Sequence, residues 1–151
     1  MKNSIRHIVL AGSSGGHILP AIKYINELSN YCSSEQIIFI TNEVGTDYLH
    51  LIEYEKKNVI QINSENKVSF ILKIIREIWN ILLFNKKITL LGFGGFISVP
   101  VLFFAKITNI LFLKDHKINF HEQNYVYGLA NKFNYFIAHH VFISFPNNYL
   151  R

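Results

Sequence analysis

A glycine-rich turn that ends in a histidine stands near the start of the chain, where residues 11–17 read AGSSGGH. Small residues let a backbone approach a ligand closely, and the helix that Pro20 is expected to open presents unpaired N–H groups and a positive dipole end. This arrangement suits a phosphate group. The order is neither the GxGxxG of dinucleotide-binding folds nor the GKS or GKT ending of a P-loop, which disfavours nicotinamide cofactors and ATP. A tight turn without a ligand is the alternative.

His17 is the candidate catalytic residue, because an imidazole at the mouth of this turn could accept a proton from a sugar hydroxyl or bind a diphosphate oxygen. A histidine that only caps the turn is the alternative. Candidate binding residues in the same turn are Ser13, Ser14, Gly15 and Gly16. Histidines expected to be structural or on the surface are His7, His50, His116, His139 and His140. No pair has metal-ligand spacing with carboxylates, so no metal site is predicted.

Two further segments carry small or polar residues where a strand is expected to end. Residues 92–98 read GFGGFIS, a second glycine turn between an expected strand and an expected helix. Residues 121–124 read HEQN and follow an apolar run, so they bring hydrogen-bonding groups to the edge of a sheet where ligands bind. A turn packed on a neighbour and a solvated loop are the respective alternatives. Candidate binding residues are Gly94, Gly95, Phe96, Glu122, Gln123 and Asn124.

Short apolar runs rich in β-branched residues predict the strands that must position these turns, and most are too continuous for half-exposed antiparallel strands. The predicted strands are residues 6–11, 37–40, 58–62, 88–91, 117–120 and 140–143. Helical spacing predicts helices after Pro20, around Tyr48 to Ile52, from Ile71 to Leu82, after Ser98 and over residues 126–137. Five β-α repeats of this kind predict a doubly wound, Rossmann-like α/β fold with a parallel sheet covered on both faces.

Composition describes a basic and apolar globular protein. The chain has 151 residues, the length of one ordinary domain, with 50% apolar residues and a formal net charge of +5. The charge favours anionic partners such as phosphorylated ligands and acidic lipid, and no nucleic-acid partner is predicted. The lone Cys32 offers neither an internal disulfide nor a zinc site, which fits a reduced, cytoplasmic setting.

One uncharged stretch, residues 88–105, approaches the length of a membrane-spanning helix. Its glycines and Pro100 favour a strand, a glycine turn and a helix instead. The apolar run near the amino terminus is shorter than the core of a signal peptide, so it is interpreted as the first strand. Residues 145–148 read FPNN, a turn-forming sequence at which a linker could begin.

Together the three segments resemble the MurG family of N-acetylglucosaminyltransferases. That family carries a GGxGGH loop with a proline shortly after it, a loop of the form GFGGYxSxP or GTGGYxSxP, and an HEQNxxxGxxN segment. The corresponding parts of this chain are residues 12–17 with Pro20, residues 92–100 and residues 121–131. Order and approximate spacing agree, and the resemblance covers nearly the whole chain.

The resemblance implies the N-terminal half of a GT-B enzyme, with residues 1–151 as the acceptor-binding domain and the C-terminal donor-binding domain absent. It implies an inverting transfer, without a cofactor, of N-acetylglucosamine from UDP-N-acetylglucosamine to the C4 hydroxyl of undecaprenyl-diphospho-muramoyl pentapeptide in peptidoglycan synthesis. His17 would be the base, and the first turn would meet the acceptor diphosphate and the donor sugar. Asn124 matches a donor-contacting residue, Glu122 could steer the acceptor, and residues 94–96 would line the acceptor side.

The chain also departs from the family pattern. Ser13 stands where the family has a glycine, Phe96 replaces a tyrosine and so lacks its hydroxyl, and a few extra residues lie between Ala105 and His121. Nothing in the chain corresponds to the donor domain, so the chain alone is expected to be inactive. Two hypotheses stay open: a transferase half that works with a donor domain in cis or in trans, and a non-catalytic remnant or membrane-docking subunit.

A basic and aromatic segment, residues 68–87, has two interpretations. Its broad apolar stripe includes Phe70, Trp79 and Phe84, with Lys and Arg residues beside it. One interpretation is a helix packed on the sheet. The other is peripheral docking on anionic lipid at the cytoplasmic face of the bacterial inner membrane, where the family's acceptor is anchored. Residues 103–112 would extend the same surface.

Overall fold

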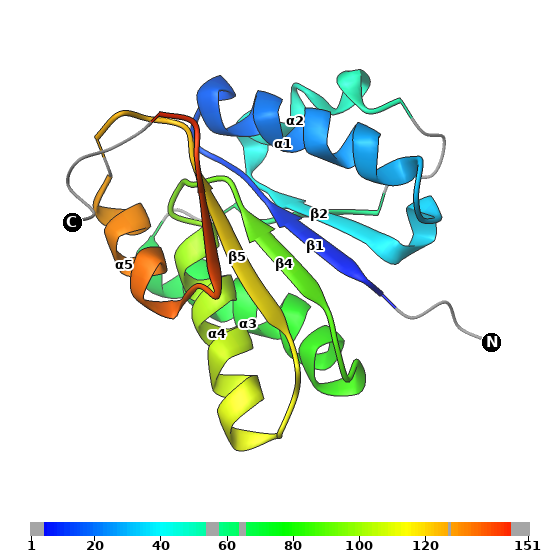
Figure 1. Ribbon diagram of the computed structural model, residues 1–151, viewed down its shortest axis with the longest axis vertical. Helices are drawn as coiled ribbons and strands as arrows, with labels where there is room; N and C mark the ends of the chain where they lie inside the picture. Colours follow the sequence, from blue (N-terminus) through cyan, green and yellow to red (C-terminus); the bar gives the residue numbers. More distant parts are fainter. Residues whose placement is uncertain (1–4, 54–57, 64–65, 127, 146–151) are drawn as a thin grey trace.

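Runs of Ile, Val, Leu and Phe form the strands of one parallel sheet (Figure 1). The computed structural model describes residues 5–53, 58–63, 66–126 and 128–145. Its strands are β1 His7–Leu10, β2 Ile37–Thr41, β3 Val59–Gln61, β4 Thr89–Gly92, β5 Lys117–Glu122 and β6 His140–Ile143. Its α-helices are α1 Gly15–Ser29, α2 Glu43–Thr46, α3 Lys67–Phe84, α4 Ser98–Leu111 and α5 Leu129–Ile137.

The strand order is β3-β2-β1-β4-β5-β6, and neighbouring strands are parallel. Strand β1 therefore lies between β2 and β4, with Val9 in register with Phe39 on one side and with Leu91 on the other. The chain first builds outward from β1 through β2 to β3 and then returns to the other side of β1 at β4. This reversal confirms the predicted doubly wound topology.

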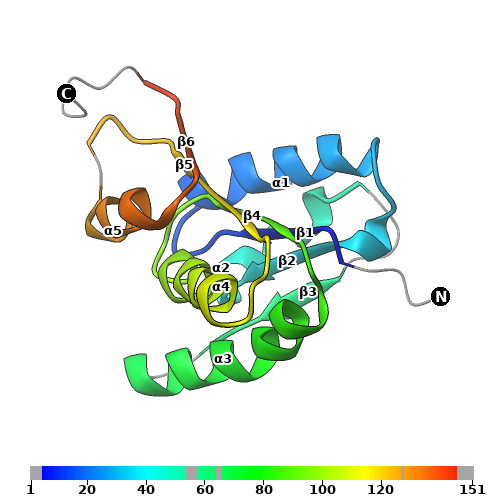
Figure 2. The ribbon, with the colours of Figure 1, turned by 60° about the horizontal axis from the view of Figure 1, so that its bottom comes forward.

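Side chains alternate along β1, so each face of the sheet has its own core. Ile8 and Leu10 belong to a buried cluster that α3 and α4 cover, whereas Val9 and Ala11 belong to a cluster that α1 covers. Figure 2 shows α1 on one face and α3 and α4 on the other. Burial on both faces explains why β1, β2 and β4 read as continuous apolar runs. The edge strand β6 differs from the prediction of a covered sheet, because three of its four residues are exposed.

Helix α1 differs from the prediction at its start. The sequence predicts a helix opened by Pro20, whereas α1 begins at Gly15 and contains Pro20. The prediction is wrong because the buried stripe already begins at Ile18, which is 0% exposed and packs with the sheet. Proline removes one helical hydrogen bond, the one to the Gly16 carbonyl, and this loss falls in the first two turns of the helix. Tertiary packing therefore outweighs the local signal.

Two other predicted helices are also displaced. No α-helix forms around Tyr48 to Ile52; the short α2 precedes this segment, and a single 3-10 turn spans Leu49–Leu51. The side chain of Asn26 on α1 ends that turn, because its Nδ2 donates to the Leu51 carbonyl at 3.0 Å and its Oδ1 accepts from the Glu53 N–H at 3.1 Å. The helix predicted over residues 126–137 begins later, as α5.

Residues 88–105 form β4, a turn and the first half of α4, as the sequence predicts. Within the described ranges, no helix is both long enough and apolar enough to cross a membrane. The predicted start of a linker at residues 145–148 falls outside the described residues except for Phe145.

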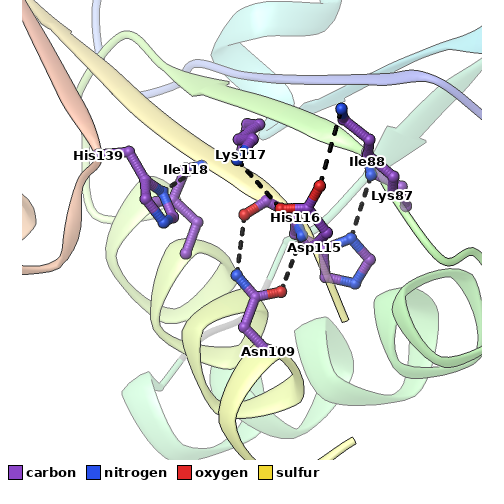
Figure 3. Close-up of polar contacts among 8 residues, drawn as sticks. All are labelled: Lys87, Ile88, Asn109, Asp115, His116, Lys117, Ile118 and His139. Carbon is purple, nitrogen blue, oxygen red and sulfur yellow. Dashed lines mark hydrogen bonds and ion pairs between the residues drawn. The ribbon is translucent and has the colours of Figure 1, made fainter. Parts of the chain in front are cut away.

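A buried histidine joins the amino ends of β4 and β5 to α3. The His116 ring is 0% exposed, its Nδ1 accepts from the Ile88 N–H at 3.1 Å, and its Nε2 donates to the Leu82 carbonyl at 3.1 Å. The side-chain amide of Asn109 on α4 holds both the N–H and the carbonyl of His116 at 2.8 Å (Figure 3). His116 is thus satisfied as a neutral imidazole, and it lies at the edge of the sheet opposite the glycine turns.

We predict that the protein loses stability as the pH falls below about 6.5, the ordinary pKa of histidine. Burial lowers the pKa of His116 and of His139, whose Nδ1 likewise accepts a backbone N–H, that of Ile118, at 2.9 Å. The unfolded chain then binds protons more readily than the folded chain, so this stability is complete above the unfolded pKa and is lost below it.

Urea unfolding between about pH 7.5 and pH 5.5 measures this loss, which is at most about 1.4 kcal/mol per pH unit for His116. A free energy of unfolding that stays constant over this range would contradict the neutral state assigned to these rings.

Candidate functional site

The turns that follow β1, β4 and β5 lie side by side at the carboxyl edge of the sheet, because their strands are neighbours (Figure 1). Between β1 and β4 the connections diverge to opposite sides, and doubly wound sheets bind ligands at such a point. The three segments predicted from the sequence therefore lie together at the expected place. The first turn consists of residues 11–14 and the second of residues 93–97.

The first two turns touch through their backbones. A Cβ on Gly95 would lie 2.7 Å from the carbonyl oxygen of Gly12, and the φ angles of Gly94 and Gly95 are 104° and 77°. Such positive values favour glycine. The buried Ser98 at the start of α4 fixes this turn by donating its Oγ hydrogen to the Gly94 carbonyl at 2.9 Å. Both space and backbone conformation therefore require glycine here.

His17, at the start of α1, lies between the two turns. Its Nδ1 is 3.1 Å from the Oγ of Ser14, the residue that precedes the helix. On the other side, a Cβ on Gly94 would lie 2.7 Å from Cδ2 and 2.8 Å from Nε2 of His17. The tautomer in which Nδ1–H donates to Ser14 leaves Nε2 as a proton acceptor, the form that a general base requires.

Ser13 is the departure from the glycine pattern, and its backbone has a φ angle of 77°, in the left-handed region. Its N–H donates to Oδ1 of Asn42 at 3.4 Å. Its own Oγ lies 3.0 Å from the point where a Cβ on Gly95 would stand. The serine thus keeps the conformation that a glycine would adopt most easily, and it adds a hydroxyl group where the two turns meet.

The HEQN segment is held to the second turn, and its polar groups differ in orientation. Glu122 is 1% exposed, and its Oε1 accepts from the N–H of Asn124 at 2.8 Å. The side-chain amide of Gln123 donates to the carbonyl of Phe93. Asn124 is exposed. The Glu122 carboxylate therefore shapes the loop from inside the protein, while Asn124 lies at the surface.

His121 and Glu122 belong to β5, so the loop that was predicted to begin at His121 begins at Gln123. The strand extends two residues beyond the apolar run. The His121 ring packs against that of Phe93, with centroids 5.3 Å apart, and burial lowers its pKa while the charge of Glu122 raises it. Among the described residues, no three His, Cys, Asp or Glu side chains gather in a way that could hold a metal ion.

Phe96 is 44% exposed and contacts Phe70 of α3, with ring centroids 5.6 Å apart.

Sequence reasoning missed two residues that adjoin the first turn. Asn42 follows β2 and bonds Ser13, and the hydroxyl oxygen of Tyr48 lies 2.9 Å from the point where a Cβ on Gly15 would stand. A polar residue directly after β2 was a usable signal for Asn42, because β2 ends at the same edge as β1. Tyr48 gave no such signal, since its segment was predicted to be helical.

We predict that G94A and G95A each destabilise the protein by about 1–3 kcal/mol, because alanine is strained at positive φ. G95A should cost more, since its Cβ meets the Gly12 carbonyl, whereas the Cβ of G94A meets the His17 side chain, which can move aside. The control is G128A, whose Cβ would meet no atom within 4 Å in the described part of the structure, apart from its chain neighbours. Thermal unfolding measures all three, and equal midpoints for G95A and G128A would contradict the contact between the turns.

The chain is similar to several UDP-N-acetylglucosamine–N-acetylmuramyl-(pentapeptide) pyrophosphoryl-undecaprenol N-acetylglucosamine transferases. The protein of Protochlamydia amoebophila is 29% identical over 95% of this chain and 39% of its own length. The protein of Wolbachia sp. subsp. Brugia malayi is 34% identical over 92% of this chain and 39% of its own length. This chain therefore spans about two fifths of these relatives.

A solved structure shares the fold. The crystal structure of Acinetobacter baumannii MurG matches 93% of this chain and 41% of its own chain, with a TM-score of 0.63 at 21% sequence identity. This likeness confirms the predicted fold class. Residues 7–143, which include all three turns, match the N-terminal domain of glycosyltransferase family 28. The chain thus belongs to glycosyltransferase family 28 and carries the N-terminal domain of that family.

Proposed function

We propose that this chain forms the acceptor-binding half of an N-acetylglucosaminyltransferase of peptidoglycan synthesis. The reaction would transfer N-acetylglucosamine from its UDP donor to N-acetylmuramyl-(pentapeptide) pyrophosphoryl-undecaprenol, in line with the names of the relatives. The observation that carries this function is the position of His17, held by Ser14 and against Gly94 between β1 and β4. Family membership supports it.

In the proposed reaction, Nε2 of His17 takes the proton from the acceptor hydroxyl. The hydroxyl oxygen then forms a bond to the anomeric carbon of N-acetylglucosamine, while the bond from that carbon to the UDP oxygen breaks and UDP leaves with the electron pair. Ser14 serves as the positioning residue, because its contact with Nδ1 orients the ring. A single displacement of this kind inverts the configuration at the anomeric carbon.

The turns would supply the binding groups. The small residues of the first turn and the start of α1 expose backbone N–H groups to a diphosphate, and the proposed contacts are Ser13, Ser14, Gly15 and Gly16. Gly94, Gly95 and Phe96 would line the acceptor side. Asn124, which is exposed, would reach the donor, with Gln123 and the buried Glu122 holding its loop in place.

A donor domain must complete the site, in cis or in trans, because this chain corresponds to about two fifths of its relatives. Without such a domain, the chain would be a non-catalytic remnant or a membrane-docking subunit. A transfer assay separates these possibilities. It would use the chain mixed with the C-terminal domain of a relative, labelled UDP-N-acetylglucosamine and the lipid-linked acceptor.

We predict that H17A lowers turnover in this assay about 10²- to 10⁴-fold, the usual contribution of a general base. The half-buried ring lies beside the small residues Ser14 and Gly94, so the unfolding midpoint should change little. The matched control is H50A, which replaces an exposed histidine outside the two glycine turns. Unchanged turnover in H17A would remove the catalytic role of His17, and no transfer with any donor domain would favour the remnant or the docking subunit.

Helices α3 and α4 carry an apolar and basic surface, here named the α3/α4 face. Its exposed apolar residues are Val68, Leu72, Phe84, Ile110, Leu111 and Phe112, and its exposed basic residues are Lys67, Lys73, Arg76, Lys86 and Lys87. Ile74, Ile78 and Leu82 of α3 are 0% exposed and pack on the sheet. One side of α3 therefore packs on the sheet, and the opposite side remains for the proposed docking on lipid.

We propose that the α3/α4 face docks on anionic lipid at the cytoplasmic face of the inner membrane, as in a peripheral protein. Figure 2 shows the two helices side by side, and Trp79 of α3 contacts Phe112 edge to face, with ring centroids 5.9 Å apart. The contact between Phe70 and Phe96 connects this face to the second turn. A lipid-anchored acceptor could then reach the glycine turns while its lipid stays in the bilayer.

We predict that the chain binds anionic vesicles and that added salt weakens this binding. The double variant K67Q/K86Q should bind roughly 30-fold more weakly, because each surface Lys contributes about 1 kcal/mol near an anionic membrane. The control is K23Q, on α1 at the opposite face of the sheet. Vesicle sedimentation measures the binding, and equal partitioning into neutral vesicles would refute the electrostatic part.

A further inference from the structure

Tyr48 lies between α2 and the core with its ring partly buried and its hydroxyl group at the first turn. The ring packs against the cluster that includes Val9, Ile18 and Phe39, beneath α1. At the other end of the side chain, the hydroxyl oxygen stands 2.9 Å from the position of a Cβ on Gly15. Only a residue without a side chain leaves room for the hydroxyl group there.

This hydroxyl group makes no hydrogen bond with any described residue, although the side chain that carries it is fixed by packing. A phenol with a buried ring usually places its polar tip where a partner can reach it. Because the ring packs against the core, a ligand that accepts this hydrogen bond costs less side-chain entropy than it would with an unpacked side chain. The hydroxyl group of Tyr48 is therefore prepared to bind a group that reaches the first turn from outside.

The first turn offers a diphosphate no cation. Residues 11–17, 42–48 and 93–97 contain no Lys or Arg, and residues 42–48 include the exposed carboxylates of Glu43 and Asp47, so the donors around the first turn are neutral N–H and O–H groups. When no charged side chain helps to hold a diphosphate, the affinity depends more strongly on each neutral donor. Each such hydrogen bond is also stronger than a hydrogen bond between two neutral groups, because the phosphate oxygen is charged.

Resting on the proposed function, we infer that Tyr48 is a further binding residue of the same site and that its hydroxyl group donates a hydrogen bond to a diphosphate oxygen of the substrate at the first turn. The residue comes from the connection after β2, so this connection borders the candidate site on the β2 side. Asn42 of the same connection bonds Ser13 and would keep the turn open toward Tyr48.

The test compares diphosphate binding by the wild-type chain, Y48F and Y31F. Y48F removes one oxygen and keeps the packed ring, whereas Tyr31 is 84% exposed and follows the far end of α1. Inorganic pyrophosphate and farnesyl diphosphate serve as probes, with the amide signals of Gly15 and Gly16 followed by NMR. We expect Y48F to raise both dissociation constants roughly tenfold and Y31F to leave them unchanged.

A double-mutant cycle with G15A adds a readout that a loss of folding would not produce. The Cβ of G15A would displace the Tyr48 hydroxyl group, so G15A should weaken pyrophosphate binding in the wild-type background and much less in the Y48F background. Urea unfolding of each variant identifies changes in dissociation constant that follow from a loss of stability.

Three outcomes overturn the inference. In the first, the dissociation constants of Y48F lie within twofold of the wild-type values. In the second, the effects of G15A and Y48F on the free energy of pyrophosphate binding are additive. In the third, pyrophosphate leaves the Gly15 and Gly16 amide signals of the wild type unchanged. None of these decides the proposed function, which depends on sugar transfer in the presence of a donor domain. If that assay fails while Y48F still weakens diphosphate binding, the site remains a diphosphate site and the transferase assignment falls.

Discussion

The candidate site depends on the close approach of two backbones, that of Gly12 in the first turn and that of Gly95 in the second. Each neighbouring feature relies on this approach. The His17 ring occupies the space that Gly94 leaves free, and Ser98 holds the Gly94 carbonyl from inside the protein. A side chain at Gly95 would push the turns apart, and the histidine would then lose the wall against which it is oriented.

The fold and the position of the glycine turns could be predicted from the sequence because both follow from strongly local signals. Strands such as 37–40 and 88–91 are short runs rich in apolar residues, and the parallel order of the strands follows from the helices between them. The glycine turns could be predicted for a similar reason, since a glycine-rich run such as residues 92–98 indicates a tight turn or a close backbone approach. Parallel strands then bring such turns to one edge.

Contacts that join distant segments could not be predicted in this way. Pro20 gave a wrong start for α1, because the burial of Ile18 decides where the helix begins. The 3-10 turn at Leu51 ends on the side chain of Asn26, a residue too distant in the sequence for a local pattern to indicate the contact. The same limit applies to the orientation of side chains. Glu122 stands in a polar tetrapeptide, yet its carboxylate lies buried on the N–H of Asn124, and Tyr48 meets Gly15 only after both segments have packed.

The central place of β1 in the sheet also governs the order in which the protein can assemble. Residues 7–10 pair with residues 37–40 on one side, but their other partner is residues 89–92, far later in the chain. Closing so long a loop is slow, and a growing chain must leave the backbone N–H and C=O groups along one edge of β1 unpaired until β4 has been synthesised. During that interval this edge can pair with strands of other chains, and only the arrival of β4 ends the risk of aggregation there.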